Sequence, residues 1–406
     1  MKHPLLLLAL TASLAFSACF HQGPKAFDPA QVNFRAEYNS LFDGQIYPAL
    51  ILGLNQLSSQ SPLTTFSLSV TSPADNAVLR VVIDSSALNY VTIIQEILPR
   101  RGETYVFQPS VKWKYDAMRR TRIPGAVDLT FTCFINDEEV DVKNLHLGYR
   151  SVNECPLSLV SNGQTTDFRW LFAAYVNEDH PQIEQILTDI MQQGTVSRLT
   201  GYQSGGVQAV HDQVFAVWYY ALDHGITYSS ISCTSNPSPR ANVQHIRFFD
   251  EVLTTRQANC IDACVFFASI LRKIGLKPVI YVEPCHAYLG YYTDRNRKQV
   301  ALLETTITSW VNFPEMQRSL DTNGRLPEAK WQKIKRYLSD EQATRYIAGS
   351  MTFDELKLAV AHSLFEKAGE YDRETYNANR DHFADSSSIT YQQLDIELLR
   401  KQVQPI

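Results

Sequence analysis

The sequence of 406 residues has no long basic run and no stretch in which basic and aromatic residues alternate. Its 37 Lys and Arg residues are outnumbered by 42 Asp and Glu residues, which gives a formal net charge of −5. Proteins that bind nucleic acid concentrate positive charge in a patch or stripe, so nucleic acid is not an expected partner. Glycine and proline, with 17 and 18 residues, occur at ordinary levels, and most of the chain should therefore fold.

Matched cysteine pairs with the spacing of zinc ligands are also missing. Cys260 and Cys264 are four positions apart, but Cys264 lies among apolar residues and is interpreted as a core residue. We therefore expect neither a metal nor another cofactor. Cys133 and Cys155 fall in the same strand-rich half of the chain, and their spacing leaves open whether they form a disulfide.

Long hydrophobic runs are confined to the start of the chain, where the apolar segment 5–16 is too short to span a bilayer. A basic start precedes this segment, and Phe16-Ser17-Ala18-Cys19 follows it, which predicts a signal peptide over residues 1–18. The segment resembles a bacterial lipoprotein signal, which implies that Cys19 is lipidated and anchors the protein to a membrane. Because Asp does not follow Cys19, the resemblance implies an outer-membrane lipoprotein that faces the periplasm or the surface. The alternative is an ordinary cleaved signal with a chance cysteine.

The pattern of apolar and polar residues in the N-terminal half predicts β-strands. Residues 19–60 are expected to be a tether and a leading segment, and residues 61–160 a β-sandwich-like domain. In Val127-Asp128-Leu129-Thr130-Phe131-Thr132-Cys133 the apolar side chains stand at odd positions, and Asn136-Asp137 then offers a turn. Alternation at a period of two, with turn residues between segments, is typical of antiparallel strands with one buried face. This domain contains no catalytic set, so it either binds a ligand or supports the following domain.

The second half changes to helical periodicity, and the whole chain is therefore predicted to be α+β. Residues 161–320 are expected to form the functional core, with leading helices near 183–190 and 207–221. Residues 321–406 are expected to form a helical C-terminal appendage that packs on the core or covers part of a cleft. Thr352-Phe353-Asp354-Glu355 predicts the start of a helix there, but no reactive set of residues appears in this region.

Three residues of the core stand in an order that suits nucleophilic catalysis. Cys260 opens an apolar helix after a capping Asn259, His286 opens a strand, and Glu304 ends the next strand. Unpaired N–H groups at a helix start stabilise a thiolate, so Cys260 is predicted to be the nucleophile. A hairpin between the two strands would bring His286, the base, close to Glu304, the group that orients it. Asp262 is expected to cap the first helical turn.

The same residues resemble the transglutaminase-like branch of the papain-type cysteine enzymes. The matching pieces are Asn259-Cys260-Ile261-Asp262, Leu271-Arg272-Lys273-Ile274-Gly275-Leu276-Lys277-Pro278, His286-Ala287-Tyr288 and Leu303-Glu304-Thr305-Thr306. The resemblance covers about residues 205–310, and it implies a papain- or transglutaminase-like core. It also implies a triad in which Cys260 is the nucleophile, His286 the base and Glu304 the orienting acid, where Asp is commoner in the family.

The resemblance implies a cell-envelope cysteine hydrolase or acyltransferase that acts on amide bonds through a thioester. The substrate would be a protein or peptide, with peptidoglycan peptides among the candidates. The oxyanion donor stays open between the backbone N–H of Cys260 and the side chains of Gln257 and Trp218. Two other hypotheses remain, namely a non-catalytic lipoprotein that binds a peptide or glycan on the same fold and a structural lipoprotein of the envelope.

Overall fold

The computed structural model describes residues 27–29, 32–54, 65–230 and 234–406. The expected signal peptide, the lipidation site Cys19 and Cys233 lie outside the described residues. In the described part, none of the helices combines the length and the apolar character needed to cross a membrane. Helices and strands are mixed along the chain, and the predicted α+β class is confirmed.

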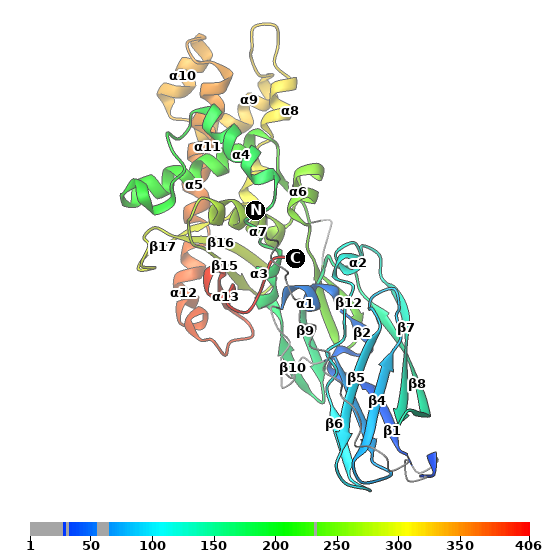
Figure 1. The fold of residues 1–406 in the computed structure, drawn as a ribbon. Coiled ribbons are helices and arrows are strands. Elements are labelled where there is room, and N and C mark those ends of the chain that lie inside the picture. The colour runs from blue at the N-terminus through cyan, green and yellow to red at the C-terminus, as the bar shows by residue number, and fades with distance from the viewer. Residues whose placement is uncertain (1–26, 30–31, 55–64, 231–233) are drawn as a thin grey trace, which may run out of the picture.

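Two sheets make up the N-terminal half, at one end of the molecule (Figure 1). One sheet has the order β1-β3-β6 and the other β2-β8-β7-β4-β5. The strands are β1 (Phe34–Tyr38), β2 (Gln45–Ile46), β3 (Phe66–Thr71), β4 (Ala77–Ile83), β5 (Thr92–Leu98), β6 (Thr104–Phe107), β7 (Gly125–Ile135) and β8 (Glu138–Tyr149). The facing sides share one core, in which the rings of Phe66 and Phe131 lie 5.5 Å apart. The two sheets therefore form a sandwich.

The alternating sequence of β7 explains its place in this sandwich. The apolar side chains at its odd positions, from Val127 to Ile135, are buried, while the intervening side chains are exposed or half-buried. Asn136 and Asp137 both have positive φ, at 51° and 66°, and they form the two-residue turn into β8. Asn and Asp tolerate this left-handed conformation well, which is why the turn could be predicted.

A further sheet has four strands, in the order β10-β9-β13-β12. It crosses the boundary expected at residue 160. Its strands are β9 (Glu154–Ser161), β10 (Gln164–Asp167), β12 (Thr234–Ser238) and β13 (Ala241–His245). Cys155 and Leu159 of β9 pack in the core of the second half, so residues from 154 onward belong with that half. Cys133, in contrast, lies in the sandwich core, and both cysteines are free, so they form no disulfide.

Helix α7 (Cys260–Lys273) is the centre of the second half. Eleven of its residues, from Ile261 to Leu271, are buried. It packs against β15 (Pro278–Glu283) and β16 (His286–Tyr292), which belong to an antiparallel sheet of order β17-β16-β15-β18. The remaining strands of this sheet are β17 (Val300–Leu303) and β18 (Gln392–Asp395). The helices and short strands that precede α7 are α1 (Pro48–Gly53), α2 (Tyr115–Arg119), α3 (Phe172–Tyr175), α4 (Gln182–Gln193), α5 (Gly206–Asp223), β11 (Thr227–Tyr228), α6 (Phe249–Thr255) and β14 (Gln257–Ala258).

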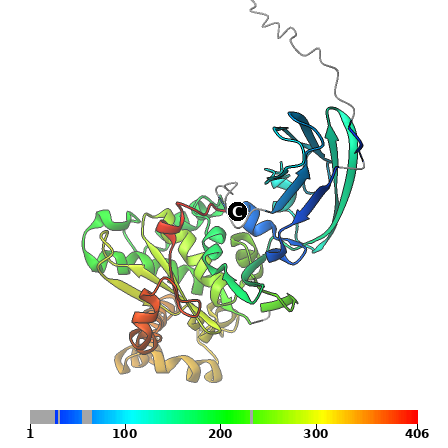
Figure 2. The same cartoon turned by 90° about the horizontal axis from the view of Figure 1, so that it is seen from below.

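The C-terminal region is more than an appendage, because its last strand completes the central sheet. Its helices are α8 (Phe313–Arg318), α9 (Glu328–Ile334), α10 (Asp340–Ala348), α11 (Phe353–Glu370), α12 (Arg373–Ala384) and α13 (Ile396–Leu399). A capping box at Thr352 begins α11, as the sequence predicts. After α12 the chain returns as β18, which pairs with β15, and the C-terminus then lies between the two halves (Figure 2). Ile406 packs against both cores there.

Replacing Ile396 by Ala should measure how far the C-terminal segment supports the fold. Ile396 is fully buried in the second core, so the variant should lose about 2–5 kcal/mol of unfolding free energy. Leu398 lies on the same short helix and is 48% exposed, so Leu398→Ala should stay within about 0.5 kcal/mol. Thermal and denaturant unfolding would check both, and equal small losses would mean that the segment does not support the core.

Candidate active site

A capping box begins the helix that carries the thiol. The side-chain oxygen of Asn259 accepts a hydrogen bond from the backbone N–H of Asp262 at 2.8 Å. The Asp262 carboxylate accepts in return from the backbone N–H of Asn259 at 3.0 Å. These two bonds use side chains to satisfy N–H groups at the helix end, and they fix the backbone on both sides of Cys260. The expected caps are confirmed.

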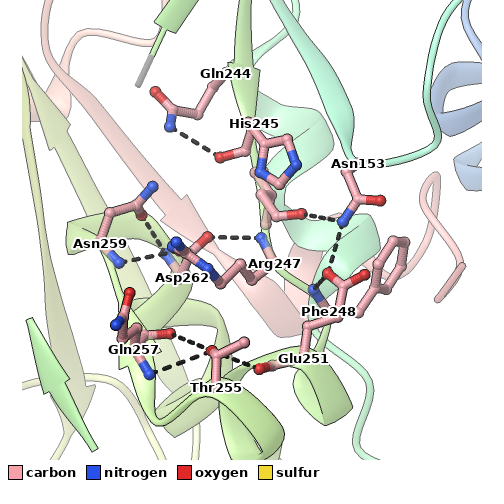
Figure 3. Close-up of polar contacts among 11 residues, drawn as sticks. Asn153, Gln244, His245, Arg247, Phe248, Glu251, Thr255, Gln257, Asn259 and Asp262 are labelled. Atoms are coloured by element: carbon pink, nitrogen blue, oxygen red, sulfur yellow. Dashed lines mark hydrogen bonds and ion pairs between the residues drawn. The ribbon is translucent and has the colours of Figure 1, made fainter. Parts of the chain in front are cut away.

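Asp262 is fully buried and holds Arg247 as well as the helix start (Figure 3). Its two oxygens accept from the guanidinium and from the backbone N–H of Arg247, each at 2.8 Å. Burial raises the pKa of Asp262, and the hydrogen bonds from Asn259 and Arg247 oppose that rise. Because both oxygens are occupied, the role of Asp262 is structural.

The segment that carries Arg247 is tied in turn to the first half of the chain (Figure 3). The amide nitrogen of Asn153 donates to the Ile246 carbonyl at 2.8 Å and to the Glu251 carboxylate at 2.7 Å. Glu251 also accepts from the backbone N–H of Phe248 at 2.8 Å. The start of α7 is thus braced by a polar network that extends to residue 153, ahead of β9.

His286 and Glu304 meet because β16 and β17 pair antiparallel. His286 begins β16 and Glu304 directly follows β17, so the hairpin brings both to the same end of the sheet. The Nε2 atom of His286 lies 2.7 Å from Oε2 of Glu304. Glu304 is fully buried, and its other oxygen accepts from the backbone N–H of Thr306 at 2.7 Å.

Cys260 interacts with the imidazole that Glu304 holds. Burial alone would lower the pKa of His286, but hydrogen bonding and charge from Cys260 and Glu304 outweigh it and raise the pKa to about 11. This shift favours the protonated form of the imidazole. The structure brings the three predicted residues together in the predicted order.

A cavity of about 340 Å³ opens beside the thiol. Cys260 and His286 line it together with residues of β9, β10 and β13, the turn between β15 and β16, and the loop before β18. Ile389 is the contribution of that last loop, so the C-terminal region does cover part of a cleft. Two acceptors of the lining, Oδ1 of Asn242 and Oε2 of Glu283, are buried and have no hydrogen-bond donor among the described residues.

Neither side chain expected as an oxyanion donor lines this cavity. Trp218 is fully buried, and its ring stacks on Phe267 at 6.0 Å inside the core. Gln257 lies on β14, and its backbone contacts Thr255 (Figure 3). The backbone N–H of Cys260 stays the simplest candidate, since it is at the first position of α7 and has no intrahelical acceptor.

Three neighbours of the triad were not predicted. Tyr228 lies close enough that, after burial, the charges of Cys260 and Glu304 contribute to raising its pKa. Glu283 is the cross-strand partner of His286, and burial raises its pKa. Asp372, directly before α12, has a carboxyl oxygen within 4.8 Å of a carboxyl oxygen of Glu304. The strand-end position of Glu283 was visible in the sequence, whereas nothing local pointed to Asp372.

His286, Glu304 and Asp372 each place one ligand atom within 4.8 Å of the other two, which is compatible with metal binding. The separation of 2.7 Å between Nε2 and Oε2 nevertheless fits a hydrogen bond better. Two ligands about 2.1 Å from a tetrahedral metal ion lie roughly 3.4 Å apart, so a metal would have to push His286 and Glu304 away from each other.

Other cysteines and histidines of the described residues lie outside the triad. Cys264 is buried, as expected of a core residue, while Cys285 is exposed with a positive φ of 63° in the turn before His286. His211 bonds to the Tyr291 hydroxyl at 2.7 Å, and His224 bonds to a backbone carbonyl. These histidines lie outside the triad.

No protein-family model matches this chain, and a search of curated proteins finds no match. The function is therefore argued from the site itself.

Replacing Asp262 by Asn should destabilise the protein. The substitution leaves the Arg247 guanidinium, whose side chain is 12% exposed, without its charged partner, and we expect a loss of about 3–5 kcal/mol of unfolding free energy. Asp250 lies exposed in the first turn of the preceding helix and supplies the control, since Asp250→Asn should change stability by about 0.5 kcal/mol or less. Comparable denaturation curves for the two variants would contradict a bracing role for Asp262.

Proposed function

We propose that the protein is a cysteine hydrolase or acyltransferase that acts on amide bonds through a thioester. One observation carries the proposal: His286 lies 2.7 Å from the buried carboxylate of Glu304 and also interacts with the side chain of Cys260. A nucleophile within reach of a base, with the base held by a third group, is the arrangement that covalent catalysis requires.

The reaction follows from these positions. The Cys260 thiolate attacks the amide carbonyl carbon, and the carbon–nitrogen bond breaks as the His286 imidazolium gives its proton to the leaving nitrogen. The acyl group then remains on Cys260 as a thioester. Water or a second amine then attacks the thioester carbonyl and gives a proton to His286, the carbon–sulfur bond breaks, and Cys260 is released as the thiolate that began the cycle. Glu304 keeps the imidazole oriented through both steps.

A transglutaminase- or papain-like core is part of this proposal. The start of α7 presents the cysteine to an antiparallel sheet, and adjacent strands of that sheet supply the histidine and the acid. This order and placement agree with the family that the sequence resembles. The sandwich and the chain after β17 lie outside the segment that resembles that family, although β18 completes the central sheet.

The lining of the cavity supports an amide-bearing substrate. The buried acceptors of Asn242 and Glu283 have no donor among the described residues, and a peptide would offer N–H groups to them. We therefore propose a protein or peptide substrate, with peptidoglycan peptides as the first to test. Lipid attachment at Cys19 and an outer-membrane location belong to the same proposal and rest on the sequence alone.

A non-catalytic binding protein is the competing function. It would use the same cavity to hold a peptide or glycan, but it would not need the interaction between Cys260 and His286. That contact therefore favours an enzyme over a binding protein.

Limited iodoacetamide at pH 6 tests the nucleophile within one molecule, because Cys285 is exposed whereas Cys260 is only partly so. If His286 stabilises a thiolate, Cys260 should be alkylated first, as read by peptide mass spectrometry. Glu304→Gln removes a charge that holds the imidazolium, and it should slow Cys260 alkylation by at least about 10-fold, the effect of one pKa unit. Cys285 should react at an unchanged rate in that variant. Preferential alkylation of Cys285 in the wild type would refute an activated Cys260.

The substrate class needs a second experiment. Peptidoglycan fragments and envelope peptides would be incubated with the wild type and with Cys260→Ala, and the products compared by mass spectrometry. Cleaved or crosslinked peptides that appear with the wild type alone would identify hydrolysis or acyl transfer. Binding by both proteins without product would favour the non-catalytic alternative.

A further inference from the structure

Asp372 occupies a helix-capping position without capping the helix. It directly precedes α12 as the N-cap residue, yet its side chain accepts no hydrogen bond from the helix. Asp at this position normally satisfies an N–H group of the first turn, and losing that bond costs about 1 kcal/mol. The side chain is instead turned into the protein, where Asp372 is 5% exposed. Some other contact must hold it there.

That contact is Glu304. One carboxyl oxygen of Asp372 lies within 4.8 Å of a carboxyl oxygen of Glu304 and of a ring nitrogen of His286, and the two carboxyl groups interact. Ionised carboxylates are acceptors and have no proton to share, so two of them can bond only when one is protonated. The oxygens of Glu304 already accept from His286 and from the Thr306 backbone, as expected of the ionised partner. Oδ2 of Asp372 is buried and receives no donor among the described residues.

We propose that Asp372 is a positioning residue of this site, with a protonated carboxyl group that donates a hydrogen bond to Glu304 and helps to fix the carboxylate that orients His286. The C-terminal helices thereby supply a fourth side chain to the triad. They also hold Glu304 by its backbone, since its N–H donates to the carbonyl of Ala368 in α11 at 2.9 Å.

The charges around Asp372 favour its neutral form. Glu304 faces it from the end of β17 and Glu283 from the end of β15, while His286 of β16 contributes a positive charge. Tyr288 on β16 and the thiol of Cys264 on α7 also interact with it. Burial, followed by the bond to Glu304 and its charge, raises the pKa of Asp372 to about 8, although His286 opposes the rise. The pKa of Glu304 is lowered, because its bonds to His286 and Asp372 outweigh burial.

This proton makes the stability of the protein depend on pH in a defined direction. In the unfolded chain an Asp releases its proton near pH 4, whereas folded Asp372 keeps it to about pH 8. The stabilising effect of the bound proton is therefore complete below about pH 4 and is lost as the pH rises to about 8. Asp372→Asn retains a donor for Glu304 and cannot ionise, so it should escape this loss.

The test compares the midpoint of thermal unfolding between pH 5 and 9 in three forms of the full chain. From pH 5 to 8.5 the wild type should lose about 2–5 °C more than Asp372→Asn. Asp385→Asn, at the exposed far end of the same helix, should follow the wild type. Asp372→Ala, which removes the donor, should be less stable than Asp372→Asn at every pH. Parallel profiles for the wild type and Asp372→Asn would overturn the proposal.

Infrared difference spectra between the wild type and Asp372→Asn observe the proton directly. A carboxylic-acid carbonyl band should be present in the wild type at pH 6, absent from the variant and lost from the wild type above about pH 8. Absence of that band at pH 6 would also overturn the proposal. Neither measurement needs turnover, so the proton on Asp372 can be refuted or supported whether or not the protein proves to be an enzyme. If Cys260 is reactive, its alkylation rate should show an inflection near pH 8 that Asp372→Asn lacks.

Discussion

The hydrogen bond between His286 and the buried carboxylate of Glu304 is the interaction on which the site depends. A buried carboxylate without partners is costly, so Glu304 has to be compensated where it lies. His286 of β16 and the Thr306 backbone, just after β17, provide that compensation, and we propose that Asp372, just before α12, adds to it. The position of the imidazole is therefore set by the folding of the whole second half rather than by a flexible loop.

The position of the Cys260 thiol is fixed by the capping of the helix that carries it. Asn259 and Asp262 cap the helix on either side of Cys260, and Asp262 also holds Arg247. The network extends from there to Asn153, so the segment just before β9 and the start of α7 are connected by polar contacts. A thiol on a capped helix and an imidazole on a packed sheet can keep their relative positions without ordering at each encounter.

The sequence could predict the features that depend on local pattern. Asn259 before an apolar run predicts a capped helix, alternation predicts β7, and a hairpin predicts that His286 meets Glu304. It could not predict contacts made by segments far apart in the chain. Asp372 approaches Glu304 only because α11 and α12 fold back over the sheet, and Gln392 to Asp395 complete that sheet from the far end of the chain. The short polar run of β18 has no strand pattern of its own, and Trp218, although rightly placed on a helix, points into the core instead of the cavity.

The central claim is the proposal that His286 activates the thiol of Cys260, and the ultraviolet absorbance of the thiolate tests it most directly. The difference spectrum between the wild type and Cys260→Ser would be recorded from pH 4 to 9 in the folded protein. The account predicts thiolate absorbance already at pH 6, and its loss at that pH in His286→Asn. Absorbance that appears only near pH 8.5, as for an ordinary cysteine, and that does not respond to His286 would contradict the account.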